Sequence, residues 1–127
     1  MAYGTLQTDV INSSTGLFST NNAYLGIAKA WCNYNGNAQT INGSFNISSV
    51  TYNGTGNYTY NFTTAMPNAN YSVVVSCDLQ TIGGAKVTMG AKVLSTTSVQ
   101  CYIGTGNGTS NGTNNDTNYA NITVFSS

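Results

Sequence analysis

A β-hairpin pattern in the first half of the chain constrains the fold more than any other feature. Its second arm, Tyr58–Thr63, alternates three aromatic residues with three polar ones, the period of two that a half-buried strand requires. Its first arm is Phe45–Tyr52. The linker, Asn53–Asn57, contains two glycines that can take the positive φ of a tight reversal. The pattern therefore predicts two antiparallel strands joined by a short turn.

The first arm of this hairpin changes phase partway along. Phe45 and Ile47 share one face, whereas Val50 and Tyr52 share the other. A one-residue shift of this kind moves side chains to the opposite face of a sheet. We therefore expect a β-bulge or twist at Ser48–Ser49.

The rest of the chain repeats short alternating segments without a helical period. Further strands are expected over Tyr24–Tyr34, Tyr71–Thr81, Lys86–Leu94, Val99–Ile103 and Tyr119–Phe125. The inward rows would be Val73, Val75, Cys77 and Leu79, then Val87, Met89, Ala91 and Val93, then Val99, Cys101 and Ile103, and finally Ile122 and Val124. About seven strands, with turn signals roughly every 8–12 residues, predict an all-β fold, a small antiparallel β-sandwich.

Two further expectations concern the predicted first strand and the segment that follows it. Asn33–Gly43 is expected to be a polar loop. Trp31, on the predicted first strand, is expected to anchor the core. The alternative is an exposed platform on which a sugar or a base stacks.

The N-terminal segment is expected to be separate from the sandwich. Residues 1–22 would form an extended attachment arm, and residues 23–127 the head domain. The arm has scattered apolar residues, of which Leu6, Val10 and Ile11 are the candidates for attachment, and a predicted turn follows at Asn12–Gly16. An arm this short does not fold alone, so it either docks on a partner or frays.

Composition excludes several classes of function. Asn, Thr, Gly and Ser make up 65 of the 127 residues, and charged residues only 5%. Three Lys and no Arg do not neutralise the phosphates that a nucleic-acid binder contacts, so no nucleic-acid partner is expected. Nor is membrane insertion expected, because no apolar run approaches the length of a membrane span. Three widely spaced cysteines indicate reduced, buried thiols.

The chemical inventory predicts binding or assembly rather than catalysis. The chain has no His, Glu or Arg, so the usual general bases and catalytic triads are missing, and no metal or other cofactor is expected. The Gly-rich segment Gly104–Asn118 is too long for an ordinary connection. We expect it to be a receptor or partner contact loop, and its candidate residues are Asn107, Asn111, Asn115 and Asp116.

A longer motif gives a family resemblance. The chain reads AKAW from Ala28, NYNG from Asn33, SFNISSVT from Ser44, NGTG from Asn53, and NFTTAMPNANY from Asn61. This order resembles a pattern in tail-fibre and other virion structural proteins of marine phages, including those of cyanobacteria: AKAWxNFNG…SFNxSSxTxNGTGxYTxNFTTAMPxANY. The match covers about Lys29 to Val75, over a third of the chain. The pattern often has Arg after its Ile, where this chain has Asn42 and Gly43 after Ile41.

The resemblance implies a virion component, made in a host cytoplasm and assembled as a homotrimer. The expected form is a short fibre or knob exposed on the particle, tail-associated and contacting the host surface, with other virion proteins and a host glycan or protein as partners. A capsid decoration protein, attached through the N-terminal arm, is the first alternative. A lectin-like carbohydrate-binding module is the second.

Overall fold

The computed structural model describes residues 10–13, 16–19, 26–78, 86–106 and 113–126. Its strands are β1 (Val10–Ser13), β2 (Gly16–Ser19), β3 (Ala30–Asn35), β4 (Thr40–Phe45), β5 (Ile47–Gly54), β6 (Asn57–Phe62), β7 (Ser72–Cys77), β8 (Lys86–Ser95), β9 (Ser98–Gly106), β10 (Thr113–Asn114) and β11 (Ala120–Phe125). Every strand pairing is antiparallel. The predicted all-β class is confirmed.

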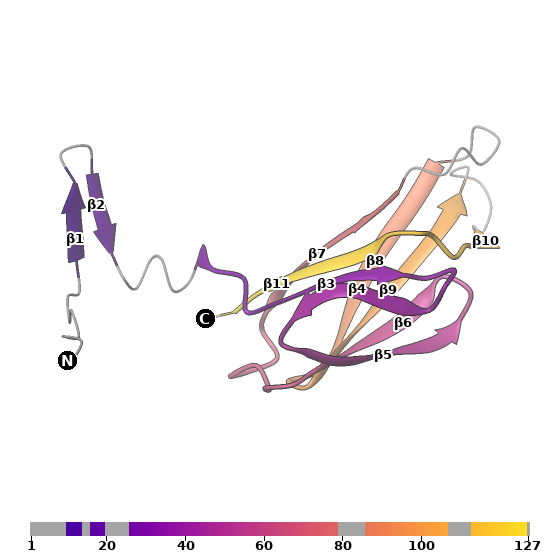
Figure 1. The fold of residues 1–127 in the computed structure, drawn as a ribbon, viewed down its shortest axis with the longest axis horizontal. Helices are drawn as coiled ribbons and strands as arrows, with labels where there is room; N and C mark the ends of the chain where they lie inside the picture. The colour runs from indigo at the N-terminus through magenta and orange to yellow at the C-terminus, as the bar shows by residue number, and fades with distance from the viewer. Residues whose placement is uncertain (1–9, 14–15, 20–25, 79–85, 107–112, 127) are drawn as a thin grey trace.

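Nine of these strands form the two sheets of a β-sandwich (Figure 1). The four-stranded sheet has the order β4-β3-β11-β7. In the five-stranded sheet, one side of β9 pairs with β8 and the other side pairs with β6 and with the short β10. β6 pairs in turn with β5, which is the next strand in the sheet. The chain crosses between the sheets after β4, β6, β7 and β10, so each sheet is built from distant segments.

The predicted central hairpin is present as β5 and β6. Its turn is tight, with Gly54 paired to Asn57 and Gly56 at a φ of +63°. The register shifts between Ile47 and Ser49, which confirms the predicted bulge. The strand that precedes the turn begins at Ile47 and not at Phe45, because the chain changes sheet between them.

The change of sheet occurs at Asn46. This residue has a φ of +57°, a left-handed conformation that Asn tolerates better than most residues. Its side-chain nitrogen donates to the carbonyls of Lys29 (3.0 Å) and Thr64 (3.1 Å), and its oxygen accepts from the Thr64 N–H (2.7 Å). Phe45 therefore ends β4 in one sheet and Ile47 begins β5 in the other, which corrects the prediction that they share a strand.

β4 occupies part of the predicted polar loop Asn33–Gly43, so that prediction is wrong. The strand lies at the edge of its sheet, and five of its six residues are exposed. An edge strand that is open to solvent on both faces needs no apolar alternation, so its sequence has no recognisable strand pattern.

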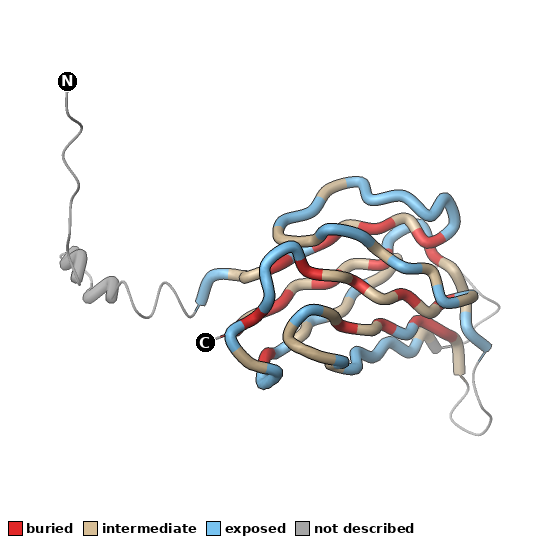
Figure 2. Tube along the Cα trace, turned by 90° about the horizontal axis from the view of Figure 1, so that it is seen from below, coloured by how far each residue is buried: buried red, intermediate tan, exposed pale blue. Residues whose placement is uncertain are grey.

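The core lies between the sheets, where buried residues alternate with residues that are mostly of intermediate burial along the strands (Figure 2). The predicted inward rows on β6, β9 and β11 are all buried: Tyr58, Tyr60 and Phe62; Val99, Cys101 and Ile103; Ile122 and Val124. Tyr34 packs edge-on against Tyr58 and Tyr60, with ring centroids 5.3 and 6.2 Å away. The Tyr60 hydroxyl donates to the Ala120 carbonyl at 2.9 Å, which joins the two sheets.

The opposite edge of the sandwich is less well covered. Val73, Val75, Cys77 and Val93 pack against the core as predicted, whereas Leu79 lies outside the described residues. Met89 is 46% exposed although it pairs with the buried Ile103, and Ala91 is also exposed. Their side of β8 faces inward, but β8 lies at the edge of its sheet and, among the described strands, pairs with β9 alone.

Trp31 does not anchor the core, so that expectation is wrong. Its neighbours Ala30 and Cys32 are buried, and the strand's period of two therefore turns Trp31 outward, where it is 42% exposed. Alternation divides β3 into two faces as predicted, but the face expected in the core is the exposed one.

The N-terminal segment contains a hairpin of its own. β1 pairs with β2 in a separate two-stranded sheet, with Ile11 opposite Phe18. Ser13 pairs with Gly16, and both residues belong to the predicted turn Asn12–Gly16.

Candidate functional site

The predicted contact loop leads into an internal hydrogen-bond network around Asp116. One carboxylate oxygen, Oδ1, accepts from the Tyr58 hydroxyl at 2.6 Å and from the Gly56 N–H at 2.8 Å. The other, Oδ2, accepts from the Tyr52 hydroxyl at 2.9 Å. Burial, followed by the hydrogen bond to Asp116, raises the pKa of Tyr58 well above its ordinary value. Asp116 therefore ties the β5–β6 turn to the segment before β11.

Asn115 is held in the same region. Its backbone N–H donates to the Ile103 carbonyl at 3.1 Å, and its side-chain nitrogen donates to Thr105 and to the Thr113 carbonyl. The other two predicted contact residues, Asn107 and Asn111, lie outside the described residues. The structure thus gives Asn115 and Asp116 partners within the domain, which no local pattern in the sequence indicated.

The predicted attachment residues lie in the N-terminal segment. Val10 and Ile11 belong to β1, where they pair with Ser19 and Phe18. Leu6 lies outside the described residues.

The three cysteines are free, and two of them are buried. Burial raises the pKa of Cys32 to about 11 and that of Cys101 to about 12. Burial, with a smaller contribution from the nearby Asp78 carboxylate, also raises the pKa of Cys77. A raised pKa keeps a thiol protonated and therefore poorly nucleophilic near neutral pH.

No group of three or more metal-ligating side chains comes together in the part of the chain that the structure describes. Within the same residues, no helix is long and apolar enough to cross a membrane.

An open groove of about 780 Å³ lies at the Asn46 corner. Its lining comes from three segments: Ile27 to Lys29, Phe45 with Asn46, and Thr63 to Pro67. Ile27 and Phe45 are more than half exposed, whereas Met66 is buried. The groove therefore has an apolar wall beside the outer face of the four-stranded sheet.

That outer face presents two neighbouring rows of side chains. The aromatic row runs across β4, β3, β11 and β7 and consists of Phe45, Trp31, Thr123 and Val74. The amide row lies two residues further along the same strands and consists of Asn42, Asn33, Asn121 and Ser76. Gly43, next to Asn42 in the chain, is the residue that pairs with Asn33. Residues that pair across strands share a face. This face was not predicted as a site, although the alternative for Trp31 was an exposed stacking platform.

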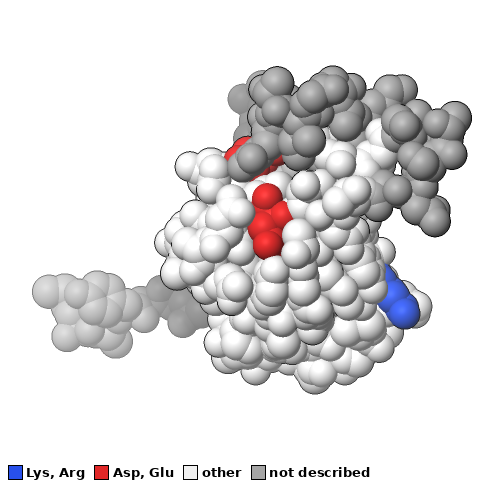
Figure 3. Space-filling model, turned by 90° about the vertical axis from the view of Figure 1, so that its right-hand side faces the viewer, with Lys and Arg blue, Asp and Glu red and all other residues white. Residues whose placement is uncertain are grey.

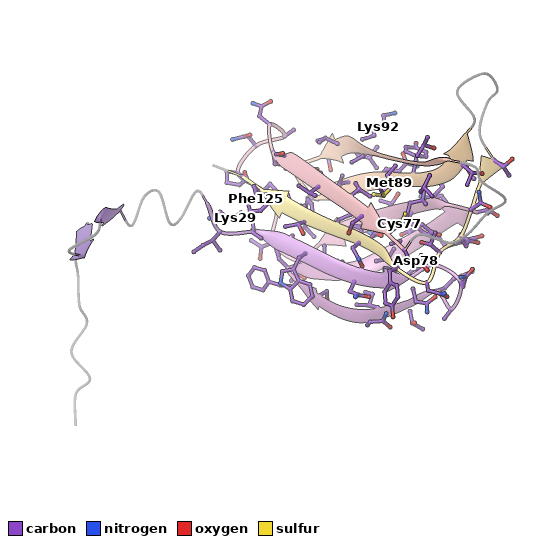
Figure 4. All side chains as sticks on the ribbon, turned by 90° about the horizontal axis from the view of Figure 1, so that it is seen from above. Lys29, Cys77, Asp78, Met89, Lys92 and Phe125 are labelled. Carbon is purple, nitrogen blue, oxygen red and sulfur yellow. The ribbon has the colours of Figure 1, made fainter. Side chains whose placement is uncertain are left out.

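The surface of the domain carries very little charge. At the end of the molecule shown in Figure 3, isolated acidic and basic side chains lie on an otherwise uncharged surface. On the four-stranded sheet, Lys29 and Asp78 lie at opposite ends (Figure 4). The middle of the face, where the two rows lie, has no formal charge.

No protein-family model matches the chain, and no curated protein or solved structure matches it either.

Proposed function

We propose that this protein is a non-enzymatic virion structural protein, a short trimeric fibre or knob exposed on a phage particle. In this proposal the sandwich is the exposed head and residues 1–22 attach it to other virion proteins. The head contacts the host surface from the tail of the particle.

The observation that carries the proposal is where the pieces of the phage-fibre motif lie. Lys29 from AKAW, Asn46 from SFN and Thr64 from TTAMP are joined by the hydrogen bonds of the Asn46 side chain. Met66, from the same TTAMP segment, is buried and donates its N–H to the Thr96 carbonyl at 2.8 Å. Three separated parts of the motif thus build one corner of the sandwich. If the phage proteins with this motif share the fold, their motif segments would need the same order to build the same corner.

The chemistry of the described residues supports a structural role. Asp116 is engaged by three donors, and the buried thiols have raised pKa values that suppress nucleophilicity. The composition favours a surface of amide and hydroxyl groups. Such groups hydrogen-bond to water, and their interactions depend little on salt because they carry no charge.

The test is to find the protein on a particle. Virions purified from cells that express the gene should contain the chain in multiples of three, measured by quantitative mass spectrometry. Antibody labelling should mark the tail; label over the capsid would instead assign the decoration role. Absence from purified virions would rule out both. For the isolated protein, sedimentation equilibrium should give three times the mass of the chain.

Deleting residues 1–22 tests the attachment role. The truncated chain should retain the circular dichroism spectrum and cooperative unfolding of a sandwich, yet be missing from virions. If the truncated protein is incorporated normally, attachment lies elsewhere in the chain.

A further inference from the structure

We propose that the outer face of the four-stranded sheet binds an uncharged sugar ring, with Trp31 as the stacking surface and the amide row as its hydrogen-bonding partner. This face lies away from the Gly-rich loop, and sugar binding there does not depend on a place in a virion.

The first observation is the exposed aromatic surface. Trp31 is 42% exposed and its cross-strand neighbour Phe45 is 55% exposed, although the core could have used both rings. Exposed aromatic groups that cluster with polar neighbours mark interaction sites. An indole face offers a flat apolar surface, with negative charge at its centre, to the C–H groups of a sugar ring.

The second observation is that the neighbouring amides have unused hydrogen-bonding groups. Asn42 donates to the Asn33 side-chain oxygen at 2.9 Å. Among the described residues, this leaves the Asn33 side-chain nitrogen as a donor and the Asn42 side-chain oxygen as an acceptor, side by side. A sugar hydroxyl both donates and accepts, so two adjacent hydroxyls match this pair.

Asn121, in the same row, strengthens this observation. Its side-chain nitrogen donates to Ser76 at 3.4 Å, but its side-chain oxygen is buried and has no partner. Most buried polar atoms in proteins have a hydrogen-bond partner, so this oxygen leaves the amide row with one further unsatisfied acceptor.

The third observation is that the ring and the amides are close together. The Trp31 ring leans over Gly43, and a Cβ added there would lie 3.5 Å from Cη2 and from Cζ3 of the indole. Gly43 is paired with Asn33 and follows Asn42 in the chain. The edge of the indole therefore reaches the amide pair, and one small ligand can contact both.

Charge selects among possible ligands. Lys29 and Asp78 lie at opposite ends of the face, and its middle is uncharged (Figure 4). With one Lys and one Asp, the face has no net charge to attract a nucleic acid or an acidic saccharide, whereas its uncharged rows match a neutral sugar. The other occupant that an exposed aromatic face accommodates is a second copy of the chain, and the experiment distinguishes the two.

The test uses the full chain and its own fluorescence, because Trp31 is the only tryptophan. Neutral hexasaccharides (cellohexaose, laminarihexaose and mannohexaose) and the acidic hexagalacturonate would be titrated, after a screen on a glycan array. We expect a neutral saccharide to change the emission saturably and the acidic one to leave it unchanged. Calorimetry should then show that Trp31→Ala weakens binding by about tenfold or more, and that Trp31→Phe keeps part of the affinity.

Two further variants locate the site. Asn33→Ala should weaken binding, because it removes the free amide donor beside the ring. Tyr102→Ala is the matched control, because Tyr102 is 37% exposed on the other sheet, and it should bind as the wild type does. Circular dichroism would check that each variant is folded.

Three results would overturn the proposal. The first is an array on which no neutral glycan binds. The second is saccharide binding that is unchanged in Trp31→Ala. The third is a smaller sedimentation mass for Trp31→Ala, which would identify the face as a contact between copies of the chain.

Discussion

Tyr58 donates its hydroxyl to Asp116 at 2.6 Å, although 58 positions separate the two residues in the chain. Tyr58 is fully buried in β6, and Asp116 precedes β11 in the opposite sheet. The same carboxylate oxygen accepts from the Gly56 N–H. One acidic side chain thus connects the turn of the central hairpin to the entry of the last strand.

Removing the Tyr58 hydroxyl should destabilise the domain. Tyr58→Phe keeps the ring packed against Tyr34 but leaves Asp116 with one donor fewer, which costs about 1–3 kcal/mol. Urea denaturation would measure the change. Tyr119→Phe is the matched control, because Tyr119 is 49% exposed, and its free energy of unfolding should stay within about 0.5 kcal/mol of wild type. Equal effects of the two substitutions would argue against the network.

The Asn46 corner can be separated into a backbone effect and a side-chain effect. Asn46→Ala loses three side-chain hydrogen bonds and places Ala at a φ of +57°, which together should cost about 2–4 kcal/mol. Asn46→Gly loses the same bonds but adopts this φ freely, so it should be less destabilised, by about 1 kcal/mol. Thermal or urea unfolding would compare them.

Gln39 provides the control for this pair. It has a φ of +55° in an exposed turn, so Gln39→Gly should change the stability by no more than about 1 kcal/mol. If Asn46→Ala were as mild as Gln39→Gly, the side-chain bonds at the corner would contribute little to the stability.

The hairpin turn should tolerate a methyl group at one glycine better than at the other. A Cβ on Gly56 would lie 2.1 Å from the Ile103 carbonyl oxygen and 2.8 Å from the Asn115 nitrogen, both backbone atoms that cannot rotate away. A Cβ on Gly54 meets nothing within 4 Å, although its φ of +134° is strained for Ala. Gly54→Ala should therefore cost about 1–3 kcal/mol.

Gly56→Ala should cost about 1–3 kcal/mol more than Gly54→Ala, because the overlap adds to the strain. Soluble expression and urea unfolding of the two variants would test the order. Greater stability of the Gly56 variant would contradict the close approach of the β9 carbonyl to the turn.

The buried thiols predict a loss of stability at alkaline pH. Cys32 has an ordinary pKa of 9.0 when unfolded and about 11 when folded. A raised folded pKa means that the stabilisation is complete below pH 9 and falls as pH rises from about 9 to 11, because the unfolded chain ionises first. The free energy of unfolding, measured by urea titration at each pH, should therefore decline in this range. Cys101, with a folded pKa of about 12, should add to the decline.

Thiol labelling gives an independent check. At pH 8, Ellman's reagent should react first with the half-buried Cys77 and with Cys32 and Cys101 only on unfolding. Replacing Cys32 with Ser should reduce the alkaline decline. Fast labelling of all three thiols in the native protein would contradict the burial.

Patterns of short range in the sequence predicted much of the fold. The buried rows on β6, β9 and β11 follow from a period of two within each strand, and the bulge after Ile47 follows from a change of phase within one strand. Each is a property of consecutive residues, so no neighbouring strand has to be known. Within the predicted N-terminal arm, β1 and β2 form a two-stranded sheet of their own, a pairing that was not predicted from the sequence.

The remaining features depend on which strands become neighbours. Alternation divides β3 into two faces, but only the position of the second sheet made the face of Ala30 and Cys32 the buried one and exposed Trp31. The inward row of β8 is partly exposed because β8 lies at the edge of the five-stranded sheet among the described strands. Asp116 was predicted as a loop contact because its partners lie about 60 residues away. The sequence by itself therefore determined where strands run and how their side chains alternate. The tertiary structure decided which face is covered and which polar groups meet, because these depend on contacts between distant segments.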